Sequence, residues 1–269
     1  MRRNLVFMTL LILLALCAAG PLLAPYDPLQ QHREIAGFPP GPQHWMGVDG
    51  FGRDIFSRFL AGAGWSVWTG LLATTVTLLL GWVAGGVAGF RKGWVDQLLG
   101  RVGDLTLSLP WLYVLIGLRA VLPLSMAPRT AVMAMLLLIA AVSWARPARL
   151  VRGVVLSLAE RGYVEAARGF GVAEFRIFLC HVLPGTWGLM ATQSLVLFPR
   201  FVLAEVTLSF LGVGAGEPQP SWGGLIVGLK QAYLIRDQWW LLLPVALMAP
   251  LFLSCAIAAR LAARRYWAA

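Results

Sequence analysis

The chain has 269 residues, of which 59% are hydrophobic and only 13% are charged, whereas soluble domains carry about 25% charged residues. A soluble domain of this length would need far more polar surface, so the composition indicates a bundle of membrane helices. The net charge of +10 would suggest nucleic-acid binding in a soluble protein, but the sequence has no cluster of aromatic and basic residues on which bases could stack.

Six apolar stretches are candidates for transmembrane helices, which need about 20 residues to cross the hydrocarbon core. They cover Leu5–Ala24, Val67–Phe90, Leu98–Leu122, Thr130–Ala145, Thr186–Leu211 and Trp239–Ala263. The first follows two arginines, as a signal peptide would, but it is longer than a usual signal and lacks a small-x-small cleavage site, which favours an uncleaved anchor. The sequence therefore predicts an all-α, polytopic membrane protein with six transmembrane helices.

Positive charge predicts the direction of these helices. With the N-terminus in the cytoplasm, most Lys and Arg residues fall in inside segments, and the outside loop at 25–64 is nearly neutral. Both termini are then cytoplasmic. The expected organisation is an anchor helix at 1–24, the outside loop, a core of five transmembrane helices at 65–263 with a cytoplasmic loop at about 146–185, and a cytoplasmic tail at 264–269.

The second apolar stretch carries Gly81, Gly85 and Gly89 at four-residue spacing. This spacing places the three glycines on one helix face, where the backbone of another helix can approach closely. The alternative is that a membrane helix simply tolerates these glycines. Either interpretation concerns architecture rather than chemistry.

Sequence signatures of catalysis are absent. The two lysines are followed by Gly93 and Gln231, so neither belongs to the Gly-Lys-Ser/Thr of a phosphate-binding loop. The three histidines are scattered and form no His-Glu-x-x-His zinc pair. We therefore expect a transporter or channel that is not itself an enzyme and binds no cofactor or metal.

The inside loop at about 146–185 is too polar to cross a membrane, yet apolar residues recur along it. Glu165-Ala-Ala-Arg168 favours a helix, and Gly169 and Gly171 allow a sharp turn. A second helix is expected from Val172 to Cys180, with Phe175, Phe178 and Leu179 on one face, and Pro184 should end it. This amphipathic hairpin suits docking into a partner's groove or lying on anionic lipid headgroups.

The spacing of Glu165-Ala-Ala, Gly171 and Leu183-Pro184 resembles the EAA loop of binding-protein-dependent ABC importer permeases. Further motifs are similar to the dipeptide, oligopeptide and nickel subfamily of these permeases, in its C-type subunit. These motifs are Ala24-Pro-Tyr-Asp-Pro28, His44-Trp-Met-Gly-Val-Asp49, Gly52-Arg-Asp-Ile-Phe-Ser-Arg58, Gly93-Trp-Val-Asp96, Ala204-Glu-Val-Thr-Leu-Ser-Phe-Leu-Gly212 and Pro220-Ser-Trp-Gly223. The C-terminus departs from the subfamily pattern.

The resemblance implies the type I ABC importer permease fold, in the cytoplasmic (inner) membrane of a bacterium. It also implies that the loop docks on a separate ATPase subunit and transmits the closure driven by ATP. The residues assigned to this coupling are Glu165, Ala166, Ala167, Arg168, Gly171, Phe175, Phe178, Leu183 and Pro184. Among them, Gly171 would supply the turn, and Phe175 and Phe178 would be anchors for the partner.

Two further sets of residues are candidates for function. The resemblance implies that the outside loop receives an external binding protein through Asp49, Arg53 and Asp54, although a salt-bridged turn would explain the same residues. Glu205 lies within the fifth apolar stretch, and an intramembrane charge is a candidate for the translocation path. A structural role for Glu205 is an equal alternative.

The function predicted is the permease subunit of an ABC importer for peptides, or for nickel or small metal chelates. Its implied partners are a homologous second permease, one or two ATPase subunits that bind ATP and Mg²⁺, an external substrate-binding protein and membrane lipid. An ion-coupled secondary transporter without an ATPase is the alternative, although no internal repeat supports it. A membrane anchor without transport activity is a third candidate.

Overall fold

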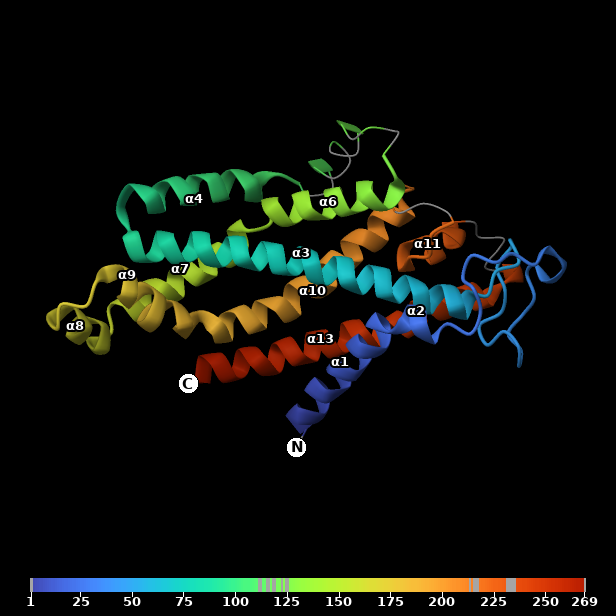
Figure 1. The fold of residues 1–269 in the computed structure, drawn as a ribbon, viewed down its shortest axis with the longest axis horizontal. Coiled ribbons are helices and arrows are strands. Elements are labelled where there is room, and N and C mark those ends of the chain that lie inside the picture. The colour runs from blue at the N-terminus through green and yellow to red at the C-terminus, as the bar shows by residue number, and fades with distance from the viewer. Residues whose placement is uncertain are drawn as a thin grey trace. The chain divides into compact units, whose positions relative to one another are not determined.

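The computed structural model describes residues 2–110, 113–114, 117, 120–121, 123, 126–212, 214, 218–230 and 236–268. Within these residues the ordered elements are helices (Figure 1), and an isolated β-bridge joins Val48 and Asp54. The longer helices are α1 (Arg2–Ala18), α3 (Ile55–Arg91), α4 (Gly93–Ser108), α6 (Pro128–Val142), α7 (Ala145–Ala159), α10 (Trp187–Phe210) and α13 (Leu243–Ala268). The shorter ones are α2 (Gly20–Leu23), α8 (Gly162–Gly169), α9 (Glu174–Ile177) and α11 (Trp222–Ile226), together with the 3₁₀ helices η1 (Arg33–Ile35), η3 (Leu183–Thr186), η4 (Val227–Lys230) and η5 (Trp239–Leu242) and the π-helix η2 (Phe178–Val182).

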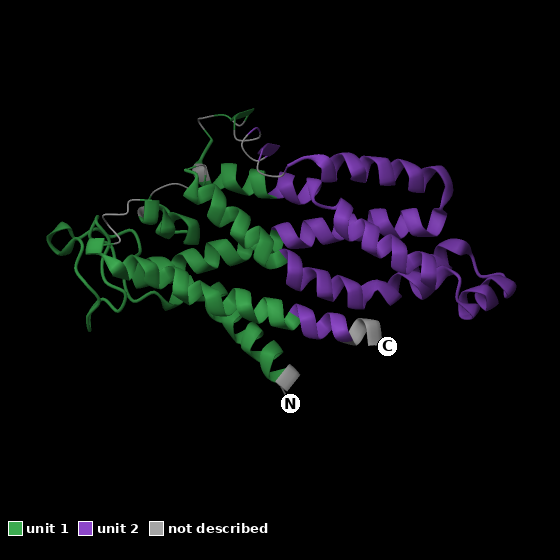
Figure 2. Cartoon of the chain, turned by 180° about the vertical axis from the view of Figure 1, so that it is seen from behind, with its two compact units in different colours: residues 1–72, 119–136, 198–258 green, residues 73–118, 137–197, 259–269 purple. Residues whose placement is uncertain are grey.

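The chain divides into two compact units (Figure 2). Unit 1 comprises residues 1–72, 119–136 and 198–258, and unit 2 comprises residues 73–118, 137–197 and 259–269. Unit 1 therefore holds the predicted outside loop and the first part of α3. Unit 2 holds the second part of α3, α4, α7 and the helices of the predicted inside loop.

Four helices in the described part of the chain are long and apolar enough to cross a membrane: Ile55–Arg91, Arg129–Ala159, Glu174–Phe210 and Trp239–Arg264. They correspond to the second, fourth, fifth and sixth stretches predicted from the sequence. The first stretch forms the shorter helix α1 followed by α2. The third begins within α4, and much of its remainder lies outside the described residues. The helical character expected from the sequence is thus confirmed for the described residues, four helices of which are long and apolar enough to span a membrane, whereas the count of six stays a prediction.

Helix α3 is longer than its apolar stretch because its ends are set by side-chain and backbone signals. At its start, Oδ2 of Asp54 accepts a hydrogen bond from the backbone N–H of Ser57 at 2.7 Å, which is the geometry of an N-cap. At its end, Lys92 and Gly93 both adopt positive φ, at 53° and 65°, and turn the chain into α4. At 37 residues, α3 is about 55 Å long, so it extends beyond a hydrocarbon core of about 30 Å.

The glycine strip of α3 packs as predicted, against α7 in unit 2. A Cβ added at Gly85 would lie 2.2 Å from the carbonyl oxygen of Ala148, and one at Gly89 would lie 2.8 Å from that of Arg152. At Gly81 the neighbours are Pro147 and the carbonyl oxygen of Trp144. The two helix backbones are therefore in direct contact, which side chains larger than hydrogen would prevent.

Candidate functional site

Two short helices joined by a break form the segment from Gly162 to Ile177, which we call the α8–α9 segment. Helix α8 ends at Gly169, Gly171 adopts a φ of 74°, and α9 begins at Glu174. A positive φ at this position favours glycine because a Cβ would clash with the backbone. The predicted hairpin and the turn at Gly171 are thus confirmed, although the second helix begins two residues later than expected.

The two faces of α8 differ in exposure. Val164 and Ala167 are buried three residues apart, whereas Glu165, Ala166 and Arg168 are exposed. Ala167 therefore packs inside its own chain, and of the two alanines only Ala166 presents a small side chain to the surroundings. The sequence could not distinguish the roles of these two alanines. Adjacent positions on a helix point in different directions, but the sequence does not show which direction faces the protein interior.

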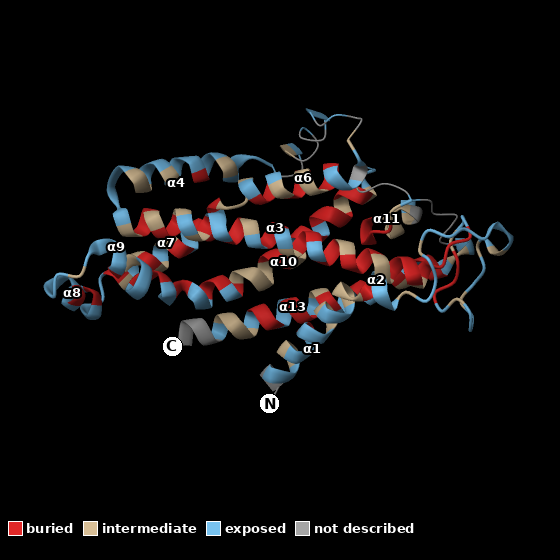
Figure 3. Cartoon of the chain, in the orientation of Figure 1, coloured by how far each residue is buried: buried red, intermediate tan, exposed pale blue. Residues whose placement is uncertain are grey.

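Helix α8 and the break after it are mostly exposed (Figure 3), and the aromatic side chains of this region divide into two groups. Phe175 is 73% exposed, as an anchor for a partner requires. Phe178 instead packs on Phe90 of α3, with ring centroids 5.0 Å apart, so it holds the segment to its own chain. Phe170 is 87% exposed at the break and is missing from the predicted anchors. The glycines on either side of it, Gly169 and Gly171, could have indicated an exposed position in the turn. Phe170 was missed because it lies outside the apolar stripe of either helix.

An ion pair spans the break. Nε of Arg168 lies 2.8 Å from Oε1 of Glu174, which joins the end of α8 to the start of α9. The hydrogen bond to the Glu174 carboxylate raises the pKa of the Arg168 guanidinium above its usual value. Arg168 thus acts within the segment, and it stabilises the turn that Gly171 permits.

The residues from Phe178 to Thr186 correct the expectation that Pro184 ends the second helix. Helical structure continues from Glu174 to Phe210, passing through the π-helix η2 and the 3₁₀ helix η3. Pro184 is tolerated because it occupies the first turn of η3, where its missing N–H is not needed. Leu183 is buried and Pro184 is exposed. Helical structure therefore connects α9 to α10 without a break.

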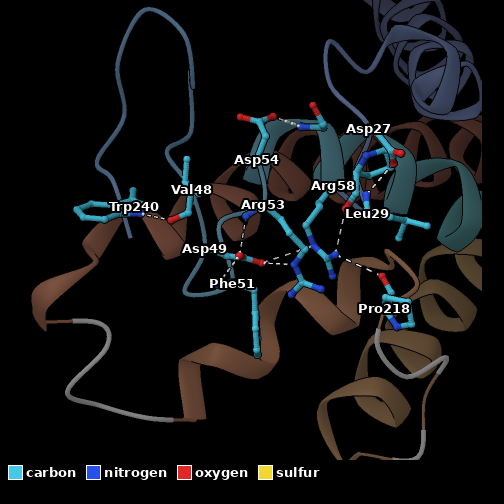
Figure 4. A network of polar contacts seen from close by, with 12 residues as sticks. Asp27, Leu29, Val48, Asp49, Phe51, Arg53, Asp54, Arg58, Pro218 and Trp240 are labelled. Atoms are coloured by element: carbon cyan, nitrogen blue, oxygen red, sulfur yellow. Dashed lines mark hydrogen bonds and ion pairs between the residues drawn. The ribbon is translucent and has the colours of Figure 1, made fainter. Parts of the chain in front are cut away.

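The predicted outside loop is held by a polar network in unit 1 (Figure 4). Oδ2 of Asp49 lies 2.8 Å from Nε of Arg53, and Oδ1 of Asp49 accepts hydrogen bonds from the backbone N–H groups of Phe51 and Arg53. Nη1 of Arg58 donates to the carbonyl oxygens of Pro28 and Pro218. The network joins the loop to the start of α3 and to the segment before α11.

This geometry changes the prediction for Arg53 and Asp54. Their exposed fractions are only 3% and 5%. Arg53 pairs with Asp49, and Asp54 caps α3 with Oδ2 while its Oδ1 lies 2.9 Å from Nδ1 of His44. Both side chains shape the loop instead of facing a receptor, which is the salt-bridged turn considered as the alternative. The exposed large side chains in this loop include Trp45 and Phe51, at 66% and 60%.

Glu205 is fully buried within unit 1. Its carboxylate accepts hydrogen bonds from the hydroxyl of Ser66 on α3 at 2.8 Å and from that of Ser209 on α10 at 2.9 Å. The Ser66 oxygen in turn accepts a hydrogen bond from the backbone N–H of Trp222 at 3.3 Å. A buried carboxylate with these partners joins α3, α10 and α11, so the geometry favours the structural alternative over the translocation path.

Two motifs that are separate in the sequence, at 204–212 and 220–223, pack together around Glu205. The hydroxyl oxygens of Ser209 and Ser221 are 3.5 Å apart, and a Cβ at Gly223 would lie 2.3 Å from that of Ser209. Trp222 is 1% exposed, stacks on Phe59 and donates from Nε1 to the Phe59 carbonyl oxygen. These motifs therefore form one packed structure at the start of α11.

Metal ligands are not clustered in the described ranges, where no three His, Cys, Asp or Glu side chains are placed to hold an ion. The arrangement in these ranges offers a polar outside loop, a buried serine–glutamate network and an exposed α8–α9 segment with two projecting aromatic rings. Of these, the α8–α9 segment is the feature best suited to contact another macromolecule, because exposed aromatic residues are enriched at protein interfaces.

Comparison with known proteins places this geometry in context. Residues 77–268 match the family described as "Binding-protein-dependent transport system inner membrane component". The chain is 34% identical over 231 residues to the dipeptide transport system permease protein DppC of Bacillus subtilis (strain 168), covering 86% of this chain and 70% of that protein. It is 35% identical over 220 residues to the oligopeptide transport system permease protein OppC of the same organism, covering 82% and 70%. The glutathione transport system permease protein GsiD of Pectobacterium atrosepticum is 33% identical over 218 residues, covering 80% and 70%.

Proposed function

The chain belongs to the family of binding-protein-dependent transport system inner membrane components, and from this premise we propose that it is the permease subunit of an ABC importer for peptides. It would form the path through the membrane without catalysing a reaction. Separate ATPase subunits would bind ATP and Mg²⁺, and an external binding protein would deliver the peptide.

The observation that carries this proposal is the exposed aromatic pair on the α8–α9 segment. Phe170 and Phe175 are 87% and 73% exposed, beside the exposed charges of Glu165 and Arg168. Large aromatic side chains that project from a polar surface are typical anchors of a protein interface. A cleft on an ATPase subunit would receive them, and Phe178 and Leu183 would hold the segment to the transmembrane helices.

The substrate class follows from the relatives. Their names specify dipeptides, oligopeptides and glutathione, which are all peptides. These names favour a peptide over the nickel or chelate alternative that the sequence motifs left open. The external binding protein would select among peptides, and the exposed Trp45 and Phe51 in the outside loop are the side chains that we assign to its docking.

The proposed topology has six transmembrane helices with both termini in the cytoplasm, in the type I importer fold. Arginines of the α7–α9 region, including Arg146, Arg149, Arg161 and Arg176, would then face the cytoplasm, as the positive-inside rule favours. A homologous second permease would complete the path. This orientation also places the α8–α9 segment on the side of the membrane where ATP is available.

The test is to co-purify the ATPase with Phe170→Ala/Phe175→Ala. The chain would be expressed together with ABC ATPase subunits of its own organism, and the amount of ATPase retained in detergent would be measured. We expect the double variant to lose the ATPase, because each anchor of this kind contributes about 2 kcal/mol or more to binding. The matched control is Phe38→Ala, which removes a 51% exposed ring from the outside loop and should retain the ATPase.

The same experiment separates the alternatives. An ion-coupled secondary transporter would co-purify with no ATPase even as wild type, and it would take up labelled dipeptide into liposomes without ATP. A membrane anchor would do neither. If the wild-type chain retains the ATPase and the double variant retains it equally, the importer survives as an assignment but the docking role of the α8–α9 segment is wrong.

A further inference from the structure

Helix α4 begins with the motif Gly93-Trp-Val-Asp96, to which the proposed function gives no role. Its large apolar side chains point away from the rest of unit 2: Trp94, Leu98, Val102 and Leu105 are all exposed. The face toward α7 carries Asp96, Leu99 and Gly103 instead, and a Cβ at Gly103 would lie 3.3 Å from that of Ala145. Interdigitating side chains therefore contribute little to the contact between α4 and α7.

A small pocket lies beside this contact. It has a volume of about 30 Å³ and lies among α3, α4 and α7, with Gly100, Ala145 and Arg152 in its wall. A space of this size is enough for about one water molecule. The pocket leaves part of the α4–α7 contact unfilled, so fewer dispersion contacts hold the two helices together at this point.

Ion pairs provide a second connection between α4 and α7. Arg152 of α7 forms two hydrogen bonds with the carboxylate of Asp96, and the one from Nη2 to Oδ2 measures 2.6 Å. The hydrogen bond from Arg152 also lowers the pKa of the Asp96 carboxyl, so Asp96 stays charged at neutral pH. The bidentate geometry fixes direction as well as distance.

Two further ion pairs lie nearby and are more exposed than the Asp96–Arg152 pair. Arg149 pairs with Asp104 further along α4, with side chains that are 53% and 68% exposed. Lys92 lies 3.2 Å from Glu160, the residue that follows α7. Exposed pairs of this kind hold geometry weakly. The Asp96–Arg152 pair has the least exposed carboxylate of the three, at 18%, and it is the pair placed beside the pocket.

Helix α7 leads directly into the α8–α9 segment, since only Glu160 and Arg161 separate it from α8. Helix α7 is also in backbone contact with α3 at Gly85 and Gly89, so α3 and α7 must move together. Helix α4 approaches α7 at Gly103, where an added Cβ would lie 3.3 Å from that of Ala145, and ion pairs at Asp96 and Asp104 also join it to α7. A force applied to the α8–α9 segment would therefore reach α3 through backbone packing, and it would reach α4 through this contact together with the ion pairs.

We propose that the Asp96–Arg152 ion pair is a positioning contact that makes α4 follow α7 when an ATPase moves the α8–α9 segment. The inference rests on the proposed function and adds the route by which the movement leaves α7. It gives the Gly93-Trp-Val-Asp96 motif a role: the turn at Lys92 and Gly93 aims α4, and Asp96 fixes its position along α7.

The test measures the distance between α4 and α7 in the assembled complex of permeases and ATPases. Spin labels would be attached at Gln97→Cys on α4 and Ser157→Cys on α7, both exposed, after Cys17, Cys180 and Cys255 are replaced by alanine. Distances would be recorded by pulsed electron paramagnetic resonance with and without ATP. We expect no change on ATP addition in the chain with native Asp96, and a shift of about 2 Å or more in Asp96→Asn, the scale of helix shifts in such transitions.

Two variants serve as controls. Asp96→Glu keeps the carboxylate and should behave as the native chain does. Asp104→Asn removes the more exposed pair on the same helix and should leave the distance unchanged on ATP addition.

The outcomes separate the inference from the proposed function. An ATP-dependent change with native Asp96, or none in Asp96→Asn, would overturn the inference alone. A shift in Asp96→Asn that is already present without ATP would show that the pair is merely structural, which also overturns it. If no ATPase assembles with the native chain, the proposed function fails and the inference fails with it.

Discussion

Replacing Gly85 by alanine tests the backbone contact between α3 and α7. The added Cβ would lie 2.2 Å from the carbonyl oxygen of Ala148 and 2.9 Å from its carbonyl carbon and its Cα. Ordinary contacts at a Cβ begin at 3.4 Å, so the helices must separate by 3.4 − 2.2 = 1.2 Å at this point. All three atoms belong to the backbone, and no side chain can rotate away to relieve the clash.

Two opposing terms set the size of the effect. Overpacking of this kind costs about 1–3 kcal/mol, and backbone neighbours favour the upper end. Alanine in place of glycine within a helix gains about 1 kcal/mol. The net loss in the free energy of unfolding should be about 2 kcal/mol. For a chain of this size that corresponds to a decrease in Tm of about 4–8 °C, measurable by intrinsic tryptophan fluorescence on heating in detergent.

The matched control makes the same substitution on the facing helix. Gly153 of α7 has no atom within 4 Å of an added Cβ, so Gly153→Ala should gain the helix propensity and raise Tm slightly. The two variants should therefore differ by about 3 kcal/mol, which follows from the two terms just given. A Gly85→Ala variant as stable as Gly153→Ala would refute the backbone contact.

Two further substitutions test unit 1. Glu205→Ala removes the acceptor of two buried serine hydroxyls and should lower the free energy of unfolding by about 3–5 kcal/mol. Glu205→Gln keeps one acceptor oxygen and should cost clearly less, so its Tm should lie between those of the native chain and Glu205→Ala. Loss of uptake at unchanged Tm would instead indicate a role in translocation. Asp54→Ala removes the N-cap of α3 and should cost about 1–2 kcal/mol, while Asp27→Ala, an exposed aspartate of the same loop, should cost less; equal Tm values for the two variants would contradict the capping role.

Local features of the α8–α9 segment could be predicted from sequence because they depend on neighbouring residues. A helix-forming run followed by glycines was sufficient to predict two helices and the turn at Gly171. The glycine strip of α3 could likewise be predicted, since four-residue spacing places residues on one helix face. The sequence does not determine the number of membrane helices, because Leu98–Leu122 mixes apolar residues with charges and a proline.

The direction of individual side chains could not be predicted, because it depends on contacts with distant parts of the chain. Phe178 satisfies the pattern of an exposed anchor, but Phe90 lies 88 positions before it (178 − 90) and covers it. Phe170 is 87% exposed, because none of the described elements packs over the break. Glu205 reads as an intramembrane charge until Ser66, 139 positions away, is placed beside it. Such pairings arise from packing that local spacing does not encode.

The contact between Ser209 and Gly223 constrains how these sequences can diverge. A side chain at Gly223 has no room, because an added Cβ would lie 2.3 Å from the Cβ of Ser209 and 2.9 Å from the backbone Cα of Val206. Losing the Ser209 side chain, however, removes a hydroxyl from the buried carboxylate of Glu205. Truncating Ser209 would therefore weaken the buried network without making room at Gly223, so descendants of this chain are expected to keep both residues.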